Sequence, residues 1–224
     1  MYTKESSTYS AESFANFMEN VVRITALRIP EALKDIWSEV RSVADIGGGS
    51  GYVLMELCRR YPQLQGIDID LPELEPVFNK YLERESSIKE GAQNLKERIF
   101  FQALDIFKED FKFKISGKKV EVDAIILGNV IHDWEDEKKL LLLKKAYAAL
   151  KPGGRIIVYE AFIDDEERLN TPSFIMSLNM QMVCKGNQVT YKQFNKWLTD
   201  VGFVNIETRT IDTCHDVIIG VKKE

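Results

Sequence analysis

From residue 42 onward, short apolar runs alternate with longer segments in which apolar positions recur every three or four residues. Short apolar runs bounded by turn residues are typical of buried strands, and the longer spacing is typical of helices. The pattern predicts strands within residues 42–49, 64–70, 98–107, 122–131 and 155–163. It predicts helices over residues 50–62, 73–85, 136–154 and 190–203, the last with Thr190 as its N-terminal cap. Two further runs, 205–212 and 215–223, predict a closing hairpin.

Strands that alternate with helices predict an α/β fold. In such a fold the strands form a mostly parallel sheet, helices cover both faces, and the crossovers are right-handed, which is a doubly wound arrangement. The alternating strands and the closing hairpin together predict a seven-stranded sheet with antiparallel pairing at one edge. Ligands of open α/β sheets bind outside the carboxyl ends of the strands, and the candidate site residues are expected there.

The chain before residue 42 has a different pattern. Residues 11–37 are helical in pattern apart from Pro30, which lacks a backbone N–H. The sequence therefore predicts an N-terminal helical segment over residues 1–42 and a main domain over residues 43–224. The helical segment either packs on the sheet or contributes Phe14, Phe17 and Met18 to the wall of a ligand pocket.

Composition restricts the classes of function. A chain of 224 residues, 45% of them hydrophobic, can bury one sizeable core. A net charge of -5 disfavours a groove for nucleic-acid phosphates. Three cysteines without CxxC or metal-ligand spacing favour a reducing compartment. No apolar stretch approaches the roughly 20 residues of a bilayer span, and the first residues lack the apolar centre of a signal peptide. These features predict a cytoplasmic protein that binds neither nucleic acid nor membrane.

A glycine-rich turn, DIGGGSG over Asp45–Gly51, joins the first predicted strand of the main domain to its first helix. Glycines there let the backbone turn tightly and approach a ligand that a Cβ atom would exclude. The dinucleotide fingerprint G-x-G-x-x-G is not met, because its third glycine, counted from Gly47 and Gly49, would fall on Tyr52. A phosphate-binding P-loop is excluded, because no Lys-Ser or Lys-Thr follows.

Acidic residues stand at the carboxyl ends of three successive predicted strands. Asp70 follows the glycine turn by about 20 residues and can accept hydrogen bonds from both hydroxyls of a ribose, which suits NAD and S-adenosylmethionine equally. Asp45 favours S-adenosylmethionine over NAD, because its carboxylate would repel a pyrophosphate and attract the amino group of a methionine moiety. Asp105 can accept from an adenine amino group, with Ile106 flanking the ring. Together with the glycines, these acids predict a site for an adenosyl ligand.

The motifs DIGGGSG, IDLP (Ile69–Pro72), LDIF and HDW occur in an order and at a spacing that resemble the S-adenosylmethionine-dependent O-methyltransferases. The closer match is the caffeate and acetylserotonin type, whose later segments resemble KPGGRIIVYE and VTYKQFNKWLTDVGF. The resemblance covers about Phe14 to the C-terminus. It implies a Rossmann-like class I methyltransferase domain over residues 43–224, with S-adenosylmethionine as cofactor and S-adenosylhomocysteine as product.

The resemblance also implies roles for individual positions, and it implies no metal. The cofactor positions are Asp45, Gly47, Gly49, Asp70, Leu71, Asp105, Ile106, Asn129 and Trp134. The catalytic positions are His132 as general base, Glu160 as the acid that orients its ring, and Gln188. The substrate positions are Phe14, Met18, Met176, Asn179 and Met180, and their apolar members favour an aromatic or polyketide-like acceptor.

Simple acid–base chemistry supports the role of His132, one of two histidines in the chain. An unperturbed histidine has a pKa of about 6.5 and is mostly neutral at pH 7. It can therefore accept a proton from a phenol or an enol, whereas an unactivated alcohol is far harder to deprotonate. Glu160, at the end of the fifth predicted strand, can stabilise the imidazolium that forms. His215 lies near the closing hairpin and is expected to be structural.

This sequence departs from the family pattern at three places. Gln188, in GNQVT, replaces the acid of a GxExT motif, so it can form a hydrogen bond but cannot supply charge. Gly128 stands where a positively charged residue often precedes the HDW motif. The usual helical dimerisation domain has no counterpart before residue 42, although a homodimer stays compatible with the resemblance. We therefore expect either an excised catalytic domain or a methylating domain of a polyketide or peptide synthase, with a small hydroxylated acceptor that is free or bound to a carrier protein.

Several alternative functions would require other sequence features. An NAD-dependent reductase needs the third dinucleotide glycine and usually a Tyr-Lys pair, and neither occurs. A metal-dependent catechol-type methyltransferase needs clustered acids. Asp133, Glu135 and Asp136 are close in sequence, but they suit the first turn of a helix, where acids interact favourably with the helix dipole. A C- or N-methyltransferase of the same fold and a non-catalytic adenosyl-binding module both stay open.

Overall fold

The computed structural model describes residues 11–88, 94–166 and 171–224, except for the side chains of residues 11, 14 and 15. The described residues form two compact units. The first contains the chain up to Asp105 together with Lys112–Val120, and the second contains Ile106–Phe111 and Glu121–Glu224. The division at residue 42 into a helical segment and a main domain stays a prediction.

The strands form a seven-stranded sheet in the order β3-β2-β1-β6-β7-β9-β8. Their bounds are β1 Ser42–Ile46, β2 Gln65–Asp70, β3 Ile99–Ala103, β6 Val122–Gly128, β7 Leu150–Glu160, β8 Phe203–Thr210 and β9 Asp216–Lys222. The pairs β1–β2, β2–β3 and β6–β7 are parallel, and β9 is antiparallel to both β7 and β8. The prediction of an α/β fold with a mostly parallel seven-stranded sheet and an antiparallel closing hairpin is confirmed.

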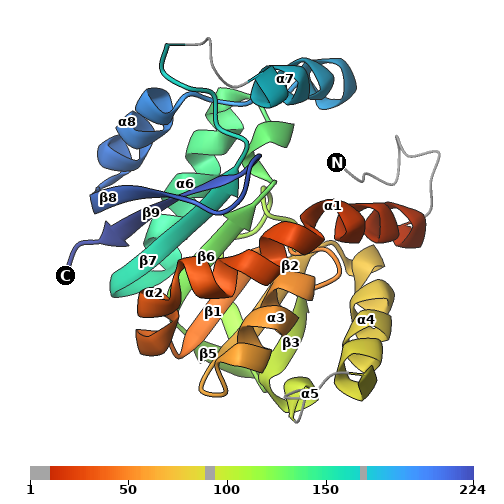
Figure 1. The fold of residues 1–224 in the computed structure, drawn as a ribbon. Helices are drawn as coiled ribbons and strands as arrows, with labels where there is room; N and C mark the ends of the chain where they lie inside the picture. Colours follow the sequence, from red (N-terminus) through yellow and green to blue (C-terminus); the bar gives the residue numbers. More distant parts are fainter. Residues whose placement is uncertain (1–10, 89–93, 167–170) are drawn as a thin grey trace. The chain divides into compact units, whose positions relative to one another are not determined.

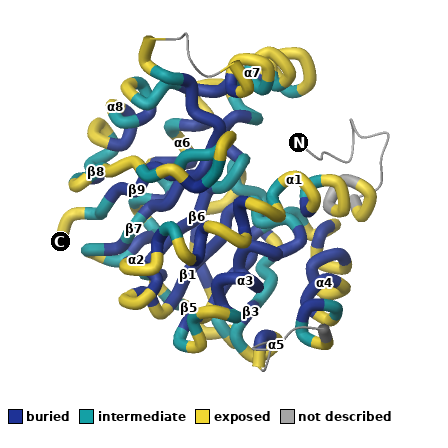
Figure 2. The backbone as a smooth tube through the Cα atoms, in the orientation of Figure 1, coloured by how far each residue is buried: buried dark blue, intermediate teal, exposed yellow. Residues whose placement is uncertain are grey.

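In the first unit, helices flank strands β1 to β3 (Figure 1). They are α1 Ala11–Ala32, α2 Lys34–Glu39, α3 Tyr52–Arg60, α4 Glu75–Ile88 and α5 Leu95–Arg98, with a 3-10 turn η1 at Pro72–Leu74. The unit has its own core, in which Ile46, Leu54 and Ile67 are fully buried. Figure 2 shows α3 almost entirely in the dark blue of buried residues, whereas α1 and α4 alternate between dark blue and yellow.

Helix α1 continues through Pro30, where the sequence pattern predicted an interruption. Proline removes the donor to the carbonyl group four residues earlier, but it lies in the last turn of α1, so only the final two residues of the helix follow it. Side chains satisfy the carbonyl groups nearby. The indole of Trp37 donates to the oxygen of Ile29 at 3.3 Å, and the hydroxyl of Tyr61 donates to that of Pro30 at 2.7 Å.

The second unit contains η2 Ile131–Asp133, α6 Asp136–Ala149, α7 Thr171–Cys184 and α8 Tyr191–Val201 around strands β6 to β9. Its core includes Ile125 and Leu142, both fully buried. Helix α8 begins as predicted, because Oγ1 of Thr190 accepts a hydrogen bond from the N–H of Gln193 at 3.1 Å. It ends at Gly202, whose φ of 117° suits a glycine.

Several features were not predicted: the short helix α5, the start of β7 at Leu150 where the pattern predicted a helix up to residue 154, and the two elements that follow. A small hairpin, β4 Phe113–Ile115 with β5 Lys118–Val120, belongs to the first unit. Helix α7 was missed because its apolar side chains do not form a buried stripe, Ser173 being its only fully buried residue among those described. Among the described residues, no helix is long and apolar enough to span a membrane.

Candidate active site

The turn between β1 and α3 has a backbone that its glycines permit. Gly47, Gly49 and Gly51 have φ angles of 76°, 66° and 72°, in the left-handed region that residues with a side chain rarely adopt. A Cβ atom added at Gly49 would meet no atom within 4 Å, so the turn is open at that point. Gly48 is enclosed instead, because a Cβ atom there would lie 2.5 Å from Oδ2 of Asp68.

Asp70 binds this turn to the end of β2. Its Oδ2 accepts a hydrogen bond from the N–H of Gly49 at 3.0 Å, and its Oδ1 accepts one from the N–H of Leu71 at 2.7 Å. Burial raises the pKa of Asp70 to about 6, although these two bonds act to lower it. Carboxylate oxygens can each accept a second bond, so Asp70 can hold the turn and also accept from a ribose. Asp105 and Ile106, predicted to hold adenine, are half-buried after β3.

Two further carboxyl groups lie near the turn, on adjacent strands. Asp45 is 2% exposed, and burial together with the charge of Asp70 raises its pKa to about 7. Its partner in the β1–β2 register is Asp68, which the sequence analysis did not identify. Asp68 is fully buried, and neither of its carboxyl oxygens has a hydrogen-bond partner among the described residues. Burial raises the pKa of Asp68 well above its usual range, which favours the protonated form of this side chain.

In the second unit, His132 lies just beyond the carboxyl end of β6. It is 8% exposed, and Glu160, the last residue of β7, is 1% exposed. Nδ1 of His132 lies 2.6 Å from Oε2 of Glu160, while Oε1 of Glu160 accepts the N–H of Ile131 at 3.1 Å. The parallel pairing of β6 with β7 brings these strand ends together. The structure thus brings together two of the three predicted catalytic residues through a sheet register.

This contact determines what each ring nitrogen can do. When ionised, Glu160 can only accept, so Nδ1 of His132 carries the hydrogen and Nε2 can accept a proton. Burial lowers the pKa of His132, but the charge and hydrogen bond of Glu160 and the charge of Asp133 outweigh it, and the net pKa is raised. Oδ1 of Asp133 lies 3.6 Å from Nε2. Both carboxylates therefore favour the imidazolium form.

The loop between α7 and α8 touches His132 at two points. Nε2 of Gln188 lies 3.2 Å from Nδ1 of His132, and Gln188 is 3% exposed. Because Nδ1 donates to Glu160, the NH2 group of Gln188 packs against this nitrogen without a hydrogen bond to it. A Cβ atom at Gly186 would lie 2.0 Å from the carbonyl oxygen of His132, so only glycine fits there. The GNQVT segment therefore supplies the predicted Gln188 and also a glycine that the sequence analysis did not identify as part of the site.

Asn129 and Trp134 lie on either side of His132 along the chain. Nδ2 of Asn129 and Nε1 of Trp134 are buried and have no hydrogen-bond partner among the described residues. The ring of Trp134 packs edge-on against Phe107, with 4.3 Å between centroids, and Nζ of Lys138 lies 4.7 Å from it. Buried donors are normally satisfied. Two orphaned donors in one short segment therefore point to a ligand that supplies acceptors.

Gly128, one of the departures from the family pattern, has a steric explanation. It pairs with Tyr159 in the β6–β7 register, and a Cβ atom at Gly128 would lie 1.9 Å from Cζ of the Tyr159 ring. Tyr159 is 3% exposed, so its ring cannot move aside easily. The tyrosine thus occupies the space into which a larger side chain at position 128 would extend.

The residues predicted for the substrate lie on two helices in different units. Met18 is half-buried on α1, and the side chain of Phe14 is outside the described residues. On α7, Met176 and Met180 are half-buried and Asn179 is exposed. Several other apolar side chains of α7 are also exposed: Phe174, Ile175, Leu178, Met182 and Val183.

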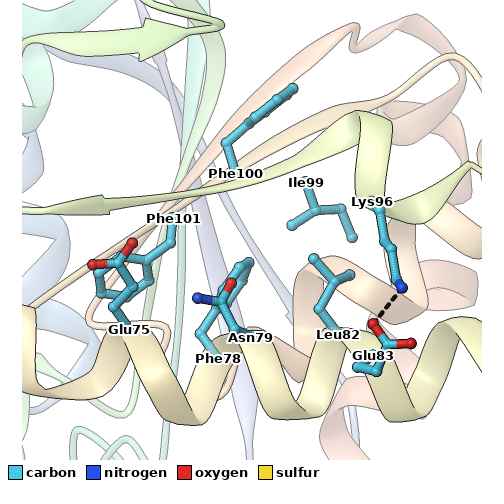
Figure 3. Close-up of a pocket in the computed structure, with 9 residues that line it drawn as sticks. All are labelled: Glu75, Phe78, Asn79, Leu82, Glu83, Lys96, Ile99, Phe100 and Phe101. Atoms are coloured by element: carbon cyan, nitrogen blue, oxygen red, sulfur yellow. Dashed lines mark hydrogen bonds and ion pairs between the residues drawn. The ribbon is translucent and has the colours of Figure 1, made fainter.

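A cavity of about 390 Å³ lies between α4 and β3 of the first unit (Figure 3). Its walls include Phe78, Leu82 and Ile99, and an ion pair between Lys96 and Glu83 lies at one end (Figure 3). None of the residues predicted for cofactor, catalysis or substrate lines this cavity.

Comparisons with known proteins identify the family and the fold of the chain. The family model of the O-methyltransferase domain matches residues 1–204. The chain is 30% identical over 187 residues to 3-hydroxy-5-methyl-1-naphthoate 3-O-methyltransferase of Streptomyces sahachiroi, covering 83% of this chain and 50% of that protein. It is 30% identical over 209 residues to human acetylserotonin O-methyltransferase, covering 88% of this chain and 56% of that protein.

A solved structure of human N-acetylserotonin methyltransferase in complex with SAM superposes with a TM-score of 0.80 at 26% identity, covering 96% of this chain and 56% of that chain. This chain therefore spans about half the length of the curated relatives that it matches. Because the family model covers most of the sequence and the fold agrees, the chain belongs to the O-methyltransferase family.

Proposed function

We propose that this chain is an S-adenosylmethionine-dependent O-methyltransferase in which His132 is the general base. The observation that carries the proposal is the buried contact of 2.6 Å between Nδ1 of His132 and Oε2 of Glu160. The contact assigns the hydrogen to Nδ1 and leaves Nε2 to take a proton from a hydroxyl group. Membership of the O-methyltransferase family favours transfer to oxygen over transfer to carbon or nitrogen.

The residues predicted for the cofactor fit S-adenosylmethionine. In the first unit, Gly49 leaves open space beside the turn, and the carboxyl groups of Asp45 and Asp70 suit an ammonium group and ribose hydroxyls. In the second unit, Asn129 and Trp134 have buried donors without partners among the described residues. When bound, S-adenosylmethionine supplies a methyl group on a positively charged sulfur, which is already activated toward a nucleophile.

With an activated methyl group, the chain mainly has to align the acceptor and remove its proton. Nε2 of His132 takes that proton, and the imidazolium that forms is stabilised by Glu160 at Nδ1. Asp133, 3.6 Å from Nε2, favours the same charged form. A phenol with a pKa of about 10 is within reach of such a base, whereas an unactivated alcohol is not.

We propose a phenol or enol hydroxyl on an aromatic or polyketide-like frame as the acceptor. The relative from Streptomyces sahachiroi is named for a hydroxynaphthoate, which is an acceptor of this class. The apolar side chains of Met176 and Met180 on α7 would suit an aromatic frame. The acceptor is either a free small molecule or a group carried on a carrier protein.

Thermal unfolding tests the cofactor, with S-adenosylhomocysteine and NADH added in separate experiments. S-Adenosylhomocysteine at about 100 times its dissociation constant should add roughly 2.7 kcal/mol to the free energy of unfolding. For a chain of this size, the melting temperature should then rise by about 5 to 10 °C. NADH at the same excess should leave it unchanged. A rise with NADH alone would overturn the proposed function together with each cofactor role.

A further inference from the structure

Lys139 is fully buried, although its side chain ends in an amino group. It lies in the first turns of α6, and the ring of Trp197 is 5.9 Å from its Nζ. Lysines are rarely buried unless they are paired. Burial lowers the pKa of Lys139, while Asp136 acts to raise it. Base catalysis by His132 does not by itself require a buried lysine, so its placement needs another explanation.

Three oxygen atoms surround Nζ of Lys139. Oδ1 of Asn187 lies at 2.7 Å, the backbone oxygen of Asn187 at 2.9 Å, and Oδ1 of Asp136 at 3.2 Å. Three acceptors match the three N–H groups of an ammonium. Two of them belong to one residue, so Lys139 holds both the backbone and the side chain of Asn187.

Asn187 stands between the two residues of the α7–α8 loop that touch His132. Gly186 packs against the carbonyl oxygen of His132, and Nε2 of Gln188 lies 3.2 Å from Nδ1 of the ring. The side-chain amide of Asn187 also donates to the carbonyl oxygen of Gln188 at 3.0 Å. The N–H of Gln188 donates to Oγ of Ser177 at 3.2 Å. The loop is therefore bound to α6 through Lys139 and to α7 through Ser177.

We propose that Lys139 is a positioning residue for the base, because through Asn187 it holds Gly186 and Gln188 against His132. The inference rests on the proposed function, which gives His132 its role. All the contacts that carry it lie within the second unit. Lys139 acts through the loop, so it is not a catalytic residue.

Because Gln188 is neutral, its position beside His132 depends on the support that Lys139 gives to the loop. A carboxylate there would be attracted to the imidazolium by charge, in addition to the support that the loop gives it. A glutamine has no comparable attraction, so its position beside Nδ1 depends on the backbone that carries it. The buried ammonium of Lys139 fixes that backbone.

The pKa of His132, measured by NMR titration, tests the inference without any methyl transfer. The chain has two histidines, so His132→Ala assigns the signals. In the native background, Gln188→Glu places a carboxylate beside Nδ1 and should raise the pKa of His132 by about one unit or more. In a Lys139→Met background the rise should fall to less than half, because the loop no longer holds the new carboxylate in place.

Lys144→Met is the matched control, because Lys144 is an exposed residue of the same helix. In that background the full rise should persist. Equal rises in the Lys139→Met and Lys144→Met backgrounds would overturn the inference, and so would the absence of any rise in the native background. If Lys139→Met does not fold, Asn187→Ser removes the two bonds of the Asn187 side chain, to Lys139 and to the oxygen of Gln188, and keeps the backbone bond to Lys139. It should reduce the rise in part, and an undiminished rise there would also overturn the inference. A chain that shows this coupling but transfers no methyl group would contradict the proposed function and leave the positioning of His132 intact.

Discussion

Nδ1 of His132 and Oε2 of Glu160 are 2.6 Å apart, at the carboxyl ends of two adjacent parallel strands. Both side chains are nearly fully buried, so water weakens their interaction little. The pair therefore controls both the direction in which the ring faces and the pH at which it gains a proton.

Glu160→Gln should lower the pKa of His132, because it keeps the size of the side chain and removes the charge that raises that pKa. The pH profile of methyl transfer should shift to lower pH, since His132 must be neutral to act as a base. The maximal rate should fall about 10- to 100-fold, as expected for losing a charge-assisted hydrogen bond worth roughly 1.5 to 3 kcal/mol. NMR titration and pH–rate profiles measure both effects. Glu137→Gln, an exposed change in α6, is the control, and an unshifted pKa in Glu160→Gln would refute the coupling.

Asp68→Asn should stabilise the ligand-free protein at high pH. Above about pH 4 the unfolded chain ionises this carboxyl group, whereas the folded chain keeps the proton to higher pH, because burial raises its pKa. The free energy of unfolding contributed by Asp68 is therefore present at low pH and falls as pH rises toward the folded pKa. The melting temperature, measured from pH 5 to about pH 9, should fall less steeply with pH for Asp68→Asn than for the native chain. The same change at the exposed Asp200 should leave the slope as it is, and parallel curves for Asp68→Asn would contradict a buried neutral acid.

Binding of S-adenosylhomocysteine should strengthen as pH rises through about 7, the pKa to which burial and Asp70 raise the Asp45 carboxyl. An ammonium group beside Asp45 favours the ionised form, so binding should release a proton. Calorimetry in two buffers of different ionisation enthalpy counts that proton. 5′-Methylthioadenosine lacks the amino group and should show a smaller dependence on pH. Asp45→Asn should weaken S-adenosylhomocysteine by roughly 10- to 100-fold and flatten its pH dependence; the same dependence for both ligands would refute the role of Asp45.

Gly128→Ala should destabilise the second unit by about 1 to 3 kcal/mol, because its Cβ atom would overlap the ring of Tyr159. For a chain of this size, the melting temperature should fall by several degrees. Tyr159→Val leaves room for the added methyl group. The double variant should therefore lose less stability than the sum of the two single changes. Strict additivity would show that Tyr159 does not restrict this position.

Much of the fold could be predicted from sequence, because alternating strands and helices carry a periodic signal. The glycine turn, Asp70 and His132 could be named as candidates because ligands of open α/β sheets bind outside the carboxyl ends of the strands. Helix α7 was missed because Ile175, Leu178 and their neighbours are exposed, so its apolar positions mark no buried face.

The supporting residues of the site carry weaker signals. Lys139 lies in the charged segment DEKK, which is typical of a solvated helix start, and only the structure shows that it is buried. Position 186 requires glycine because the backbone of His132, distant in sequence, lies against it. Asp68 is buried because the glycine turn, at Gly48 and Gly51, lies against its side chain. Contacts between residues far apart in sequence determine these features, and local patterns do not record them.

The most direct test of the account is methyl transfer from labelled S-adenosylmethionine to a panel of hydroxylated naphthoates and indoles, with the native chain and with His132→Ala. We predict that the native chain methylates at least one phenolic hydroxyl, and that His132→Ala slows this transfer about 10²- to 10⁴-fold. The affinity of His132→Ala for S-adenosylhomocysteine, measured in parallel, should stay the same. Transfer by His132→Ala at the native rate would contradict the role of His132 as the base.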